Sequence, residues 1–255
     1  MPELHPRRVA GIALAAFFAL PLGVLGVRAF ADAWRAPALI PQDFGLRGMR
    51  EAFSGIALDA FANSLIVAVV VTTLALALGW PAARVLGERR LRRPGIVFLL
   101  LAMPLLVPSY ATGQGLTEWF LRLGLADTIP GLVLAHLVLV LPYVIVILLS
   151  AFGPRVTVLE EMGRSQGLSP AQRWRWVTLP AVAPTLAAAS FLGFLISWSE
   201  YGSSLAVGGG RAMLPIVLLP FVRNDPQVAA ALSLLFLAPA VAALALSARA
   251  ARSPL

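Results

Sequence analysis

The sequence has 255 residues, of which 59% are hydrophobic and 13% are charged, and its formal net charge is +8. Soluble domains carry charge on about a quarter of their residues, so this composition excludes an ordinary soluble domain and indicates an integral membrane protein. The chain has no cysteine and no lysine, which excludes a disulfide, a cysteine metal site and the lysine of a nucleotide-binding P-loop. With only His5 and His136, a histidine-rich metal site is not expected.

Six uncharged runs are long enough for membrane spans, because a helix needs roughly 20 apolar residues to cross a bilayer. In chain order the runs are Val9 to Val27, Ala60 to Ala83, Pro94 to Thr117, Thr128 to Ala151, Trp176 to Ser199 and Pro226 to Ala248. An even number of spans places both termini on the same side of the membrane.

The first run follows Arg7 and Arg8, as the apolar core of a cleavable signal peptide would. It is longer than the roughly 7 to 15 residues of such a core, so we expect a retained span. The segment Ala29 to Asp59 then forms an outer loop with a short helix at Leu46 to Phe53.

Arg84 to Arg93 is an arginine-rich connection that ends at Pro94. Pro104, Pro108, Pro142 and Pro239 are expected to kink their spans. The uncharged segment Ala212 to Val222 is too short to cross as a helix, so it is interpreted as interfacial or re-entrant.

The arginines predict the orientation, because positive residues near span ends are retained in the cytoplasm. One side holds Arg7, Arg8, Arg84, Arg89, Arg90, Arg92, Arg93, Arg155, Arg164, Arg173, Arg175, Arg249 and Arg252, and the other holds Arg28, Arg35, Arg47, Arg50, Arg122, Arg211 and Arg223. Both termini and the loop Glu160 to Pro180 are therefore predicted to be cytoplasmic. This sidedness also explains the basic net charge without nucleic-acid binding.

The cytoplasmic loop has the signals of two helices joined at a glycine. Pro154 suits the first turn of a helix, and Gly167 suits the left-handed conformation just past its end. Ser169, Pro170 and Gln172 form a capping-box pattern for a second short helix. Leu179-Pro180 and Pro184 are then expected to redirect the chain into the fifth span.

The spacing of Glu161-Met162-Gly163, Gly167 and Val177-Thr178-Leu179-Pro180 resembles the signature of the permease subunits of binding-protein-dependent ABC importers. That signature reads Glu-Ala-Ala, three residues, Gly, nine residues, Ile-x-Leu-Pro. Met162 and Gly163 stand in place of the two alanines, and Val177 stands in place of the isoleucine. The likeness extends from Asn63 to the C-terminus, through Pro81-Ala82-Ala83, Met103-Pro104 and Val107-Pro108.

The resemblance implies an all-α membrane protein with six transmembrane helices, in the type I importer bundle. It implies a single permease domain over residues 1–255, with a core at 58–250 and a coupling loop at 153–182. The loop would couple the pathway to ATPase subunits through Glu160, Glu161, Met162, Gly163, Ser165, Gly167, Leu168, Ser169 and Pro170, with Val177, Leu179 and Pro180 as anchors. Within this set, Glu161 would hold the loop or contact the ATPase, Gly163 would permit close approach and Gly167 would set the elbow.

The implied partners are two ATPase subunits that bind ATP and Mg, a second permease that is identical or homologous, and an extracytoplasmic solute-binding protein. The chain would lie in the bacterial inner membrane, without a catalytic site, cofactor or metal of its own. The solute would be an inorganic oxyanion, ferric iron, thiamine or a polyamine. The alternatives are an ion-gradient-driven transporter or channel, or a membrane-embedded enzyme.

Candidates for the pathway are Asn63, Tyr110, Ser197, Glu200 and Tyr201. At the end of the fifth span two interpretations stay open: Ser197 to Gly202 faces a translocation cavity, or Trp198 and Tyr201 lie in the outer aromatic belt with Glu200 in water. His136 is interpreted as a hydrogen-bonded packing residue. Asn63, Ser64, Thr72 and Thr73 are interpreted as groups that hydrogen-bond between helices.

Overall fold

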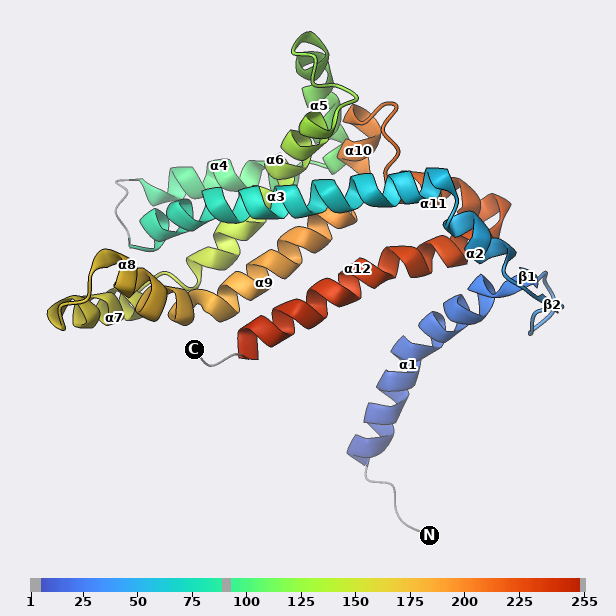
Figure 1. Ribbon diagram of the computed structural model, residues 1–255, viewed down its shortest axis with the longest axis horizontal. Coiled ribbons are helices and arrows are strands. Elements are labelled where there is room, and N and C mark those ends of the chain that lie inside the picture. Colours follow the sequence, from blue (N-terminus) through green and yellow to red (C-terminus); the bar gives the residue numbers. More distant parts are fainter. Residues whose placement is uncertain (1–5, 89–92, 253–255) are drawn as a thin grey trace. The chain divides into compact units, whose positions relative to one another are not determined.

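The computed structural model describes residues 6–88 and 93–252 (Figure 1). Arg89, Arg90 and Arg92 of the predicted arginine-rich connection lie outside these residues. The described elements, in chain order, are α1 (Pro6–Ala29), β1 (Ala31–Ala33), β2 (Asp43–Phe44), α2 (Arg47–Ala52), α3 (Gly55–Gly87), α4 (Pro94–Leu106), α5 (Ser109–Arg122), α6 (Ile129–Leu149), α7 (Pro154–Ser165), α8 (Pro170–Arg173), η1 (Trp174–Thr178), α9 (Leu179–Trp198), α10 (Gly202–Val207), α11 (Leu214–Asn224) and α12 (Pro226–Arg252).

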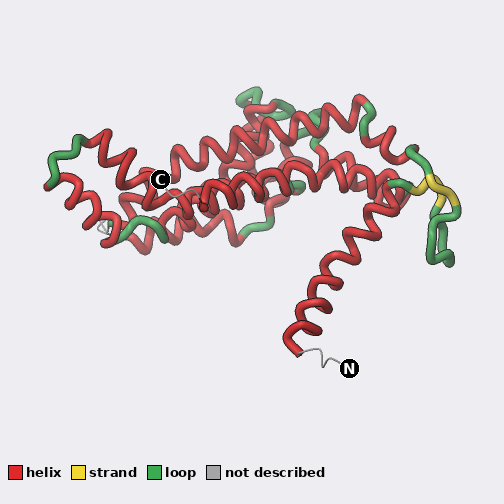
Figure 2. The backbone as a smooth tube through the Cα atoms, turned by 60° about the horizontal axis from the view of Figure 1, so that its bottom comes forward, coloured by secondary structure: helices red, strands yellow, loops and turns green. Residues whose placement is uncertain are grey.

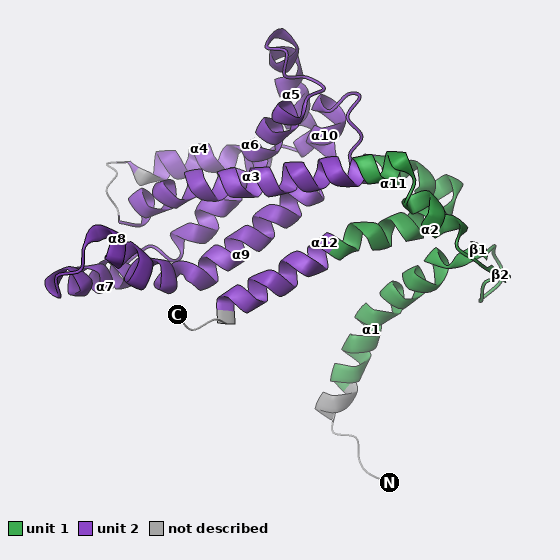
Figure 3. Ribbon diagram, viewed as in Figure 1, with its two compact units in different colours: residues 1–59, 217–238 green, residues 60–216, 239–255 purple. Residues whose placement is uncertain are grey.

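The chain divides into two compact units, coloured separately in Figure 3. One comprises residues 1–59 and 217–238, and the other comprises residues 60–216 and 239–255. The single permease domain over residues 1–255, with its core at 58–250, stays a prediction.

The apolar runs form long helices, as predicted for an all-α membrane protein. Among the described residues, five helices are long and apolar enough to cross a membrane: Ala10–Ala29, Gly55–Gly87, Ile129–Leu149, Pro170–Trp198 and Pro226–Ala251. A sixth crossing is obtained when Gly95–Leu106 and Ser109–Arg122 are taken as one broken span.

The third run is not one straight helix, which corrects the prediction of a continuous span from Pro94 to Thr117. Its two halves meet at 99°. Val107 between them is extended, with φ −101° and ψ 134°, because a residue before proline is sterically disfavoured from the helical region. Pro108 thus breaks the span rather than kinking it.

The core of the larger unit is built around α6. A Cβ atom added to Gly79 of α3 would lie 3.0 Å from Val144 Cγ1, and one added to Gly193 of α9 would lie 3.1 Å from Val144 Cγ2. Small residues at helix interfaces let backbones approach closely in membranes. Val144 of α6 therefore packs between two glycines from two other helices.

α5 and α10 form a second close pair in this unit. A Cβ atom at Gly113 would lie 2.7 Å from the Ala206 Cβ atom. Thr117 Oγ1 also donates a hydrogen bond of 3.1 Å to the carbonyl oxygen of Ala206. The second half of the broken span is thus attached to the short helix that follows α9.

The smaller unit contains residues 29–59, the predicted outer loop, which we call the outer segment, and the predicted short helix is confirmed there as α2 (Arg47–Ala52). The sequence did not predict the antiparallel pair β1 and β2, drawn in yellow in Figure 2. Arg47 pairs with Asp225 at 2.5 Å, its backbone N–H donates to Asp32, and Gln227 Nε2 donates to the Trp34 carbonyl oxygen. These bonds connect the outer segment to the start of α12.

Candidate functional site

The predicted cytoplasmic loop is a compact helical hairpin. α7 begins at Pro154 and ends at Ser165. The Leu168 N–H then donates to the Gly163 carbonyl oxygen at 3.1 Å, and the Gly167 N–H donates to that of Arg164 at 3.0 Å. This is the Schellman arrangement, which requires a left-handed residue just past the helix end. Gly167 supplies it with φ +83°, so the predicted glycine break is confirmed.

The second helix begins as the sequence predicts. The Gln172 N–H donates to Ser169 Oγ, and Gln172 Oε1 accepts from the Ser169 N–H at 2.8 Å, which completes a capping box. Pro170 occupies the first turn, where its missing N–H is not needed.

The end of the second helix differs from the prediction. The helix does not stop before Leu179-Pro180: it passes through the π-helix η1 (Trp174–Thr178) into α9, so that Pro170–Trp198 is continuous. The Leu179 N–H bonds to the Trp174 carbonyl oxygen, five residues back. Pro180 then falls in the first turn of α9, where proline is tolerated, so it does not redirect the chain.

Gly163 lies inside the hairpin. An added Cβ atom would lie 3.3 Å from Leu168 Cδ1 and 3.4 Å from side-chain atoms of both Arg173 and Val177. A glycine in place of alanine at this position therefore lets the two arms of the loop close on each other.

The other predicted coupling residues fall into two groups. Glu161, Met162, Ser165, Gly167, Ser169 and Pro170 are exposed, whereas Glu160, Leu168 and the predicted anchors Val177, Leu179 and Pro180 are partly buried. The exposed group follows the outer side of the hairpin, with Met162 55% exposed.

Glu160 holds the hairpin, which is one of the two roles that the family resemblance left open for Glu161. Glu160 Oε2 accepts from Arg84 of α3 at 2.5 Å, and Glu160 Oε1 accepts from Thr178 Oγ1 of η1 at 2.5 Å. We call Arg84, Glu160 and Thr178 the loop clamp. Arg84 also bonds to Glu88 at 2.8 Å. No local sequence signal could reveal the contact of Glu160 with Arg84, because the two residues are 76 positions apart.

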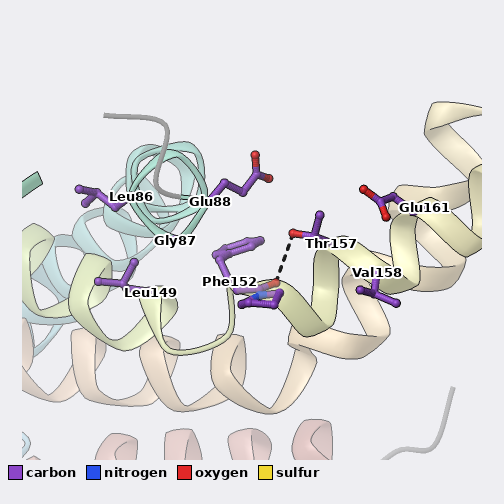
Figure 4. A pocket seen from close by; sticks show the side chains of 10 residues that line it. Leu86, Gly87, Glu88, Leu149, Phe152, Thr157, Val158 and Glu161 are labelled. Atoms are coloured by element: carbon purple, nitrogen blue, oxygen red, sulfur yellow. Dashed lines mark hydrogen bonds between the residues drawn. The ribbon is translucent and has the colours of Figure 1, made fainter. Parts of the chain in front are cut away.

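A cleft of about 880 Å3 opens between the end of α3 and the start of α7 (Figure 4). Leu86 lines it from α3, Glu88 lies just past the end of α3, Phe152 lines it from the connection before α7, and Val158 and Glu161 line it from α7. Thr157 Oγ1 bonds back to the Gly153 carbonyl oxygen at 3.3 Å.

Within the membrane-spanning part, His136 lies in a network of neutral groups. Its Nδ1 is 3.0 Å from Ser197 Oγ of α9, and its Nε2 is 2.8 Å from Ser204 Oγ of α10. We call these three residues the histidine network. The interpretation of His136 as a hydrogen-bonded packing residue is confirmed, and Ser197 faces His136.

Glu200 caps a helix. Its Oε1 accepts from the Ser203 N–H at 2.8 Å at the start of α10, and Glu200 also borders a pocket of about 160 Å3 with Tyr143 and Ser109. Trp198 is 1% exposed and contacts Phe61 and Phe194, so the interpretation that placed it in the outer aromatic belt is wrong. Its aromatic neighbours enclose the ring that the belt would have exposed.

The five pathway candidates do not converge on one cavity. Asn63 donates to the Ala212 carbonyl oxygen at 3.0 Å, Tyr110 is exposed, and Tyr201 is partly buried at the start of α10. The side chains of Ser197 and Glu200 bond to different residues, His136 and Ser203, but Ser204 of the histidine network also donates to the Glu200 carbonyl oxygen at 2.9 Å.

The interpretation of the hydroxyl groups on α3 holds only in part. Ser64 Oγ accepts the Leu214 N–H at 2.9 Å and so reaches another element, as Asn63 does. Thr72 and Thr73 instead bond to carbonyl oxygens of their own helix, a common alternative for hydroxyl side chains. Within residues 6–88 and 93–252, no group of three or more His, Asp or Glu side chains is arranged to hold a metal ion.

Comparison with known proteins finds relatives in sequence and in structure. No model of a known protein family matches it. It is 32% identical over 200 residues to the molybdenum transport system permease protein ModB of Mycobacterium tuberculosis, which covers 72% of this chain and 75% of that protein. It is 26% identical over 234 residues to the putative 2-aminoethylphosphonate transport system permease protein PhnV of Salmonella typhimurium, covering 90% of this chain and 88% of the relative.

A third relative is the trehalose transport system permease protein SugB of Mycobacterium tuberculosis, 30% identical over 193 residues, with 73% of this chain and 69% of that protein covered. The fold matches that of a chain from a bacterial ABC transporter involved in the import of the acidic polysaccharide alginate, with a TM-score of 0.66, 16% identity and coverage of 98% and 99%.

The fold and the sequence relatives together define a helical transport subunit of the membrane. The chain belongs to the permease family of binding-protein-dependent ABC importers. It is accordingly a multi-pass inner-membrane protein.

Proposed function

We propose that this chain forms the solute pathway of a bacterial ABC importer and that the coupling loop, residues 153–182, docks onto a separate ATPase subunit. The observation that carries the proposal is the hairpin itself: a Schellman turn and a capping box fix its shape, while Glu161, Met162 and Ser165 remain exposed along α7. A rigid loop with an exposed side is suited to transmit force, because little of the movement is lost in rearranging the loop.

The proposed assembly contains two ATPase subunits, a second permease and an extracytoplasmic solute-binding protein. ATP and Mg belong to the ATPase, and this chain makes and breaks no bond. The excess of arginines on one side of the spans supports an orientation with both termini and the loop in the cytoplasm.

For the solute we propose a small molecule such as an inorganic oxyanion, ferric iron, thiamine or a polyamine. The names of the relatives include molybdenum and 2-aminoethylphosphonate, and also trehalose. The phosphonate group of 2-aminoethylphosphonate is an organic oxyanion, which supports a small anionic solute, whereas trehalose keeps a sugar as the alternative outcome. The solute-binding protein recovered with the purified complex would decide between these classes, because its ligand preference can be measured on the isolated protein.

The test is gentle purification of the tagged chain from its native membrane, followed by mass spectrometry of the retained proteins. We expect an ATPase subunit with the unmodified chain and its loss from Met162→Arg, because a buried charge without a partner opposes docking. Leu39→Arg is the matched control, since Leu39 is 91% exposed in the outer segment and lies outside the coupling loop. A chain that is reproducibly isolated alone would contradict the proposal and favour a gradient-driven transporter.

A further inference from the structure

Glu160 and Glu161 are adjacent acidic residues on α7, but the structure gives them different surroundings. Glu161 is exposed. The side chain of Glu160 is 19% exposed and its two oxygens accept hydrogen bonds from two different elements. Successive residues on a helix point about 100° apart, so only Glu160 reaches the interior of the hairpin.

The two hydrogen bonds of Glu160 join α7 to the C-terminal end of α3 and to the N-terminal end of α9. One oxygen reaches Arg84 in the last turn of α3, and the other reaches Thr178, the last residue of η1, directly before α9. α8, η1 and α9 are already one continuous helix, so a displacement of the loop reaches α9 through the backbone. α3 has no such covalent route, because the connection from α3 to the loop runs through α4, α5 and α6.

We propose that Glu160 is a positioning residue that transmits movement of the coupling loop to α3 through its ion pair with Arg84. This inference rests on the proposed function, since it assumes that an ATPase moves the loop. It reassigns Glu160 from a contact with the ATPase to an internal link, and it leaves the exposed Glu161 as the acidic residue available to the partner.

The ion pair between Arg84 and Glu160 is expected to contribute little to the stability of the fold, which is compatible with a role in transmitting movement. Ion pairs open to water contribute about 0–1 kcal/mol to stability, and the Arg84 side chain is 35% exposed. α3 is also held independently near the start of the loop, where Trp80 packs edge-to-face on Phe152 at 5.1 Å. Removing the carboxylate charge is therefore expected to leave the fold intact.

The surroundings of Arg84 explain how the single carboxylate of Glu160 can hold α7 against α3. Arg84 lies between Glu88 at 2.8 Å and Glu160 at 2.5 Å, so the bond to Glu88 fixes the guanidinium relative to its own helix. The Glu160 carboxylate then holds α7 against α3, because charge-assisted hydrogen bonds are shorter and stronger than neutral ones.

The experiment uses the complex purified with its ATPase in lipid nanodiscs. Because the chain contains no cysteine, spin labels are introduced through Val85→Cys on α3 and Val158→Cys on α7, both exposed positions. The distance between the labels is measured by pulsed electron paramagnetic resonance, without nucleotide and with MgATP trapped by vanadate. With Glu160 present, we expect the same narrow distance distribution in both states, since the two helices move together.

In Glu160→Gln we expect ATPase retention and thermal stability at the level of the labelled parent, together with a shifted and broader distribution in the trapped state. Thr178→Val, which removes the other bond of the same carboxylate, is expected to keep the parent distribution. Glu118→Gln is the matched control for loss of a carboxylate, because Glu118 forms an exposed ion pair with Arg122 on α5.

Each other outcome counts against a defined claim. An unchanged distribution in Glu160→Gln, or a parent whose distance already changes on trapping, overturns the inference alone. Loss of ATPase retention or of thermal stability in Glu160→Gln overturns it in favour of a structural role. A parent complex that contains no ATPase overturns the proposed function, and this inference with it.

Discussion

The loop clamp and the histidine network each join three helical elements, and they do so with opposite chemistry. The loop clamp connects α3, α7 and η1 through a guanidinium, a carboxylate and a hydroxyl. The histidine network connects α6, α9 and α10 through an imidazole and two hydroxyls. His136 is 0% exposed, whereas Arg84 is 35% exposed.

The difference follows from the cost of burying charge. An unpaired ion in an apolar medium is far more costly than a neutral hydrogen-bonding group, so a link deep in the bundle is built from neutral donors and acceptors. A neutral imidazole donates from one nitrogen and accepts at the other, and a hydroxyl can fill either role. At the end of the bundle a cleft of about 290 Å3 adjoins Arg84 and Glu160, and an ion pair is tolerated there. The buried link is therefore expected to serve stability, and the ionic link to serve motion.

The largest effect should come from His136→Ala, which removes both bonds of the histidine network. Ser197 and Ser204 would lose a partner inside the bundle, and the truncated side chain would leave a cavity. We expect a loss of about 3 kcal/mol in stability, measured as a lower melting temperature of the purified protein. His136→Gln, which keeps one donor and one acceptor, should recover part of the loss; equal melting of His136→Ala and the unmodified protein would contradict the assignment.

Removing one hydroxyl group from the histidine network and one from the loop clamp compares how much each contributes to stability. Ser204→Ala leaves the buried Nε2 of His136 without its partner, which costs about 1–3 kcal/mol. Thr178→Val leaves an oxygen of Glu160 that water in the neighbouring cleft can reach, so less than about 1 kcal/mol is expected. If Thr178→Val lowered the melting temperature more than Ser204→Ala, the proposed division between stability and motion would be wrong.

A substitution at the left-handed Gly167 tests whether transport depends on the shape of the loop. Gly167→Val places a β-branched side chain at φ +83°, which costs about 1–2 kcal/mol. We expect ATP-dependent uptake to be abolished while membrane insertion is retained. Gly124→Val is the matched control, because Gly124 also has a positive φ, of +68°, with open space around it; undiminished uptake in Gly167→Val would remove the role of the loop elbow.

The smallest effect is expected at the ion pair of the outer segment. The hydrogen bond from Arg47 lowers the pKa of Asp225 below its usual value of 3.8. Stability from this pair is therefore fully present above that value, and it is lost as the pH falls through the lower pKa of the folded protein. Asp225→Asn should lower the melting temperature slightly near neutral pH, by less than about 1 kcal/mol in stability.

The same substitution should have no effect once the pH is low enough to protonate Asp225. Asp43→Asn, at another acidic residue of the outer segment, serves as the control in the same pH series. A difference between Asp225→Asn and the unmodified protein that persisted undiminished at the lowest pH would exclude an ionic origin.

Local signals in the sequence predicted the loop well. The Schellman glycine, the capping box and the proline at the start of α7 each depend on residues within a few positions of one another, and the chemistry of each is specific. The apolar runs predicted the spans for a similar reason, since a bilayer imposes a minimum length.

Features that depend on distant residues or on rotation about a helix axis were not predicted. Hydropathy could not show which of Glu160 and Glu161 faces the hairpin, nor that Thr178 and Arg84 would meet on one carboxylate. Pro108 predicts a kink, whereas the structure has a break at Val107-Pro108, because proline alone does not specify how far a helix bends. The π-helix gave no signal in the sequence, and it replaced the change of direction expected at Leu179-Pro180 with a continuous helix.

The π-helix sets the rotational phase between the loop and the fifth span. Each residue of an α-helix advances the side-chain direction by about 100°, and a π-turn closes its bonds over one residue more than an α-turn. Deleting one residue within Trp174–Thr178 would restore α-helical bonding into α9 and would turn Pro170–Arg173 by about 100° around the helix axis. The five residues of η1 therefore determine the direction in which the hairpin projects when α9 is held in the membrane.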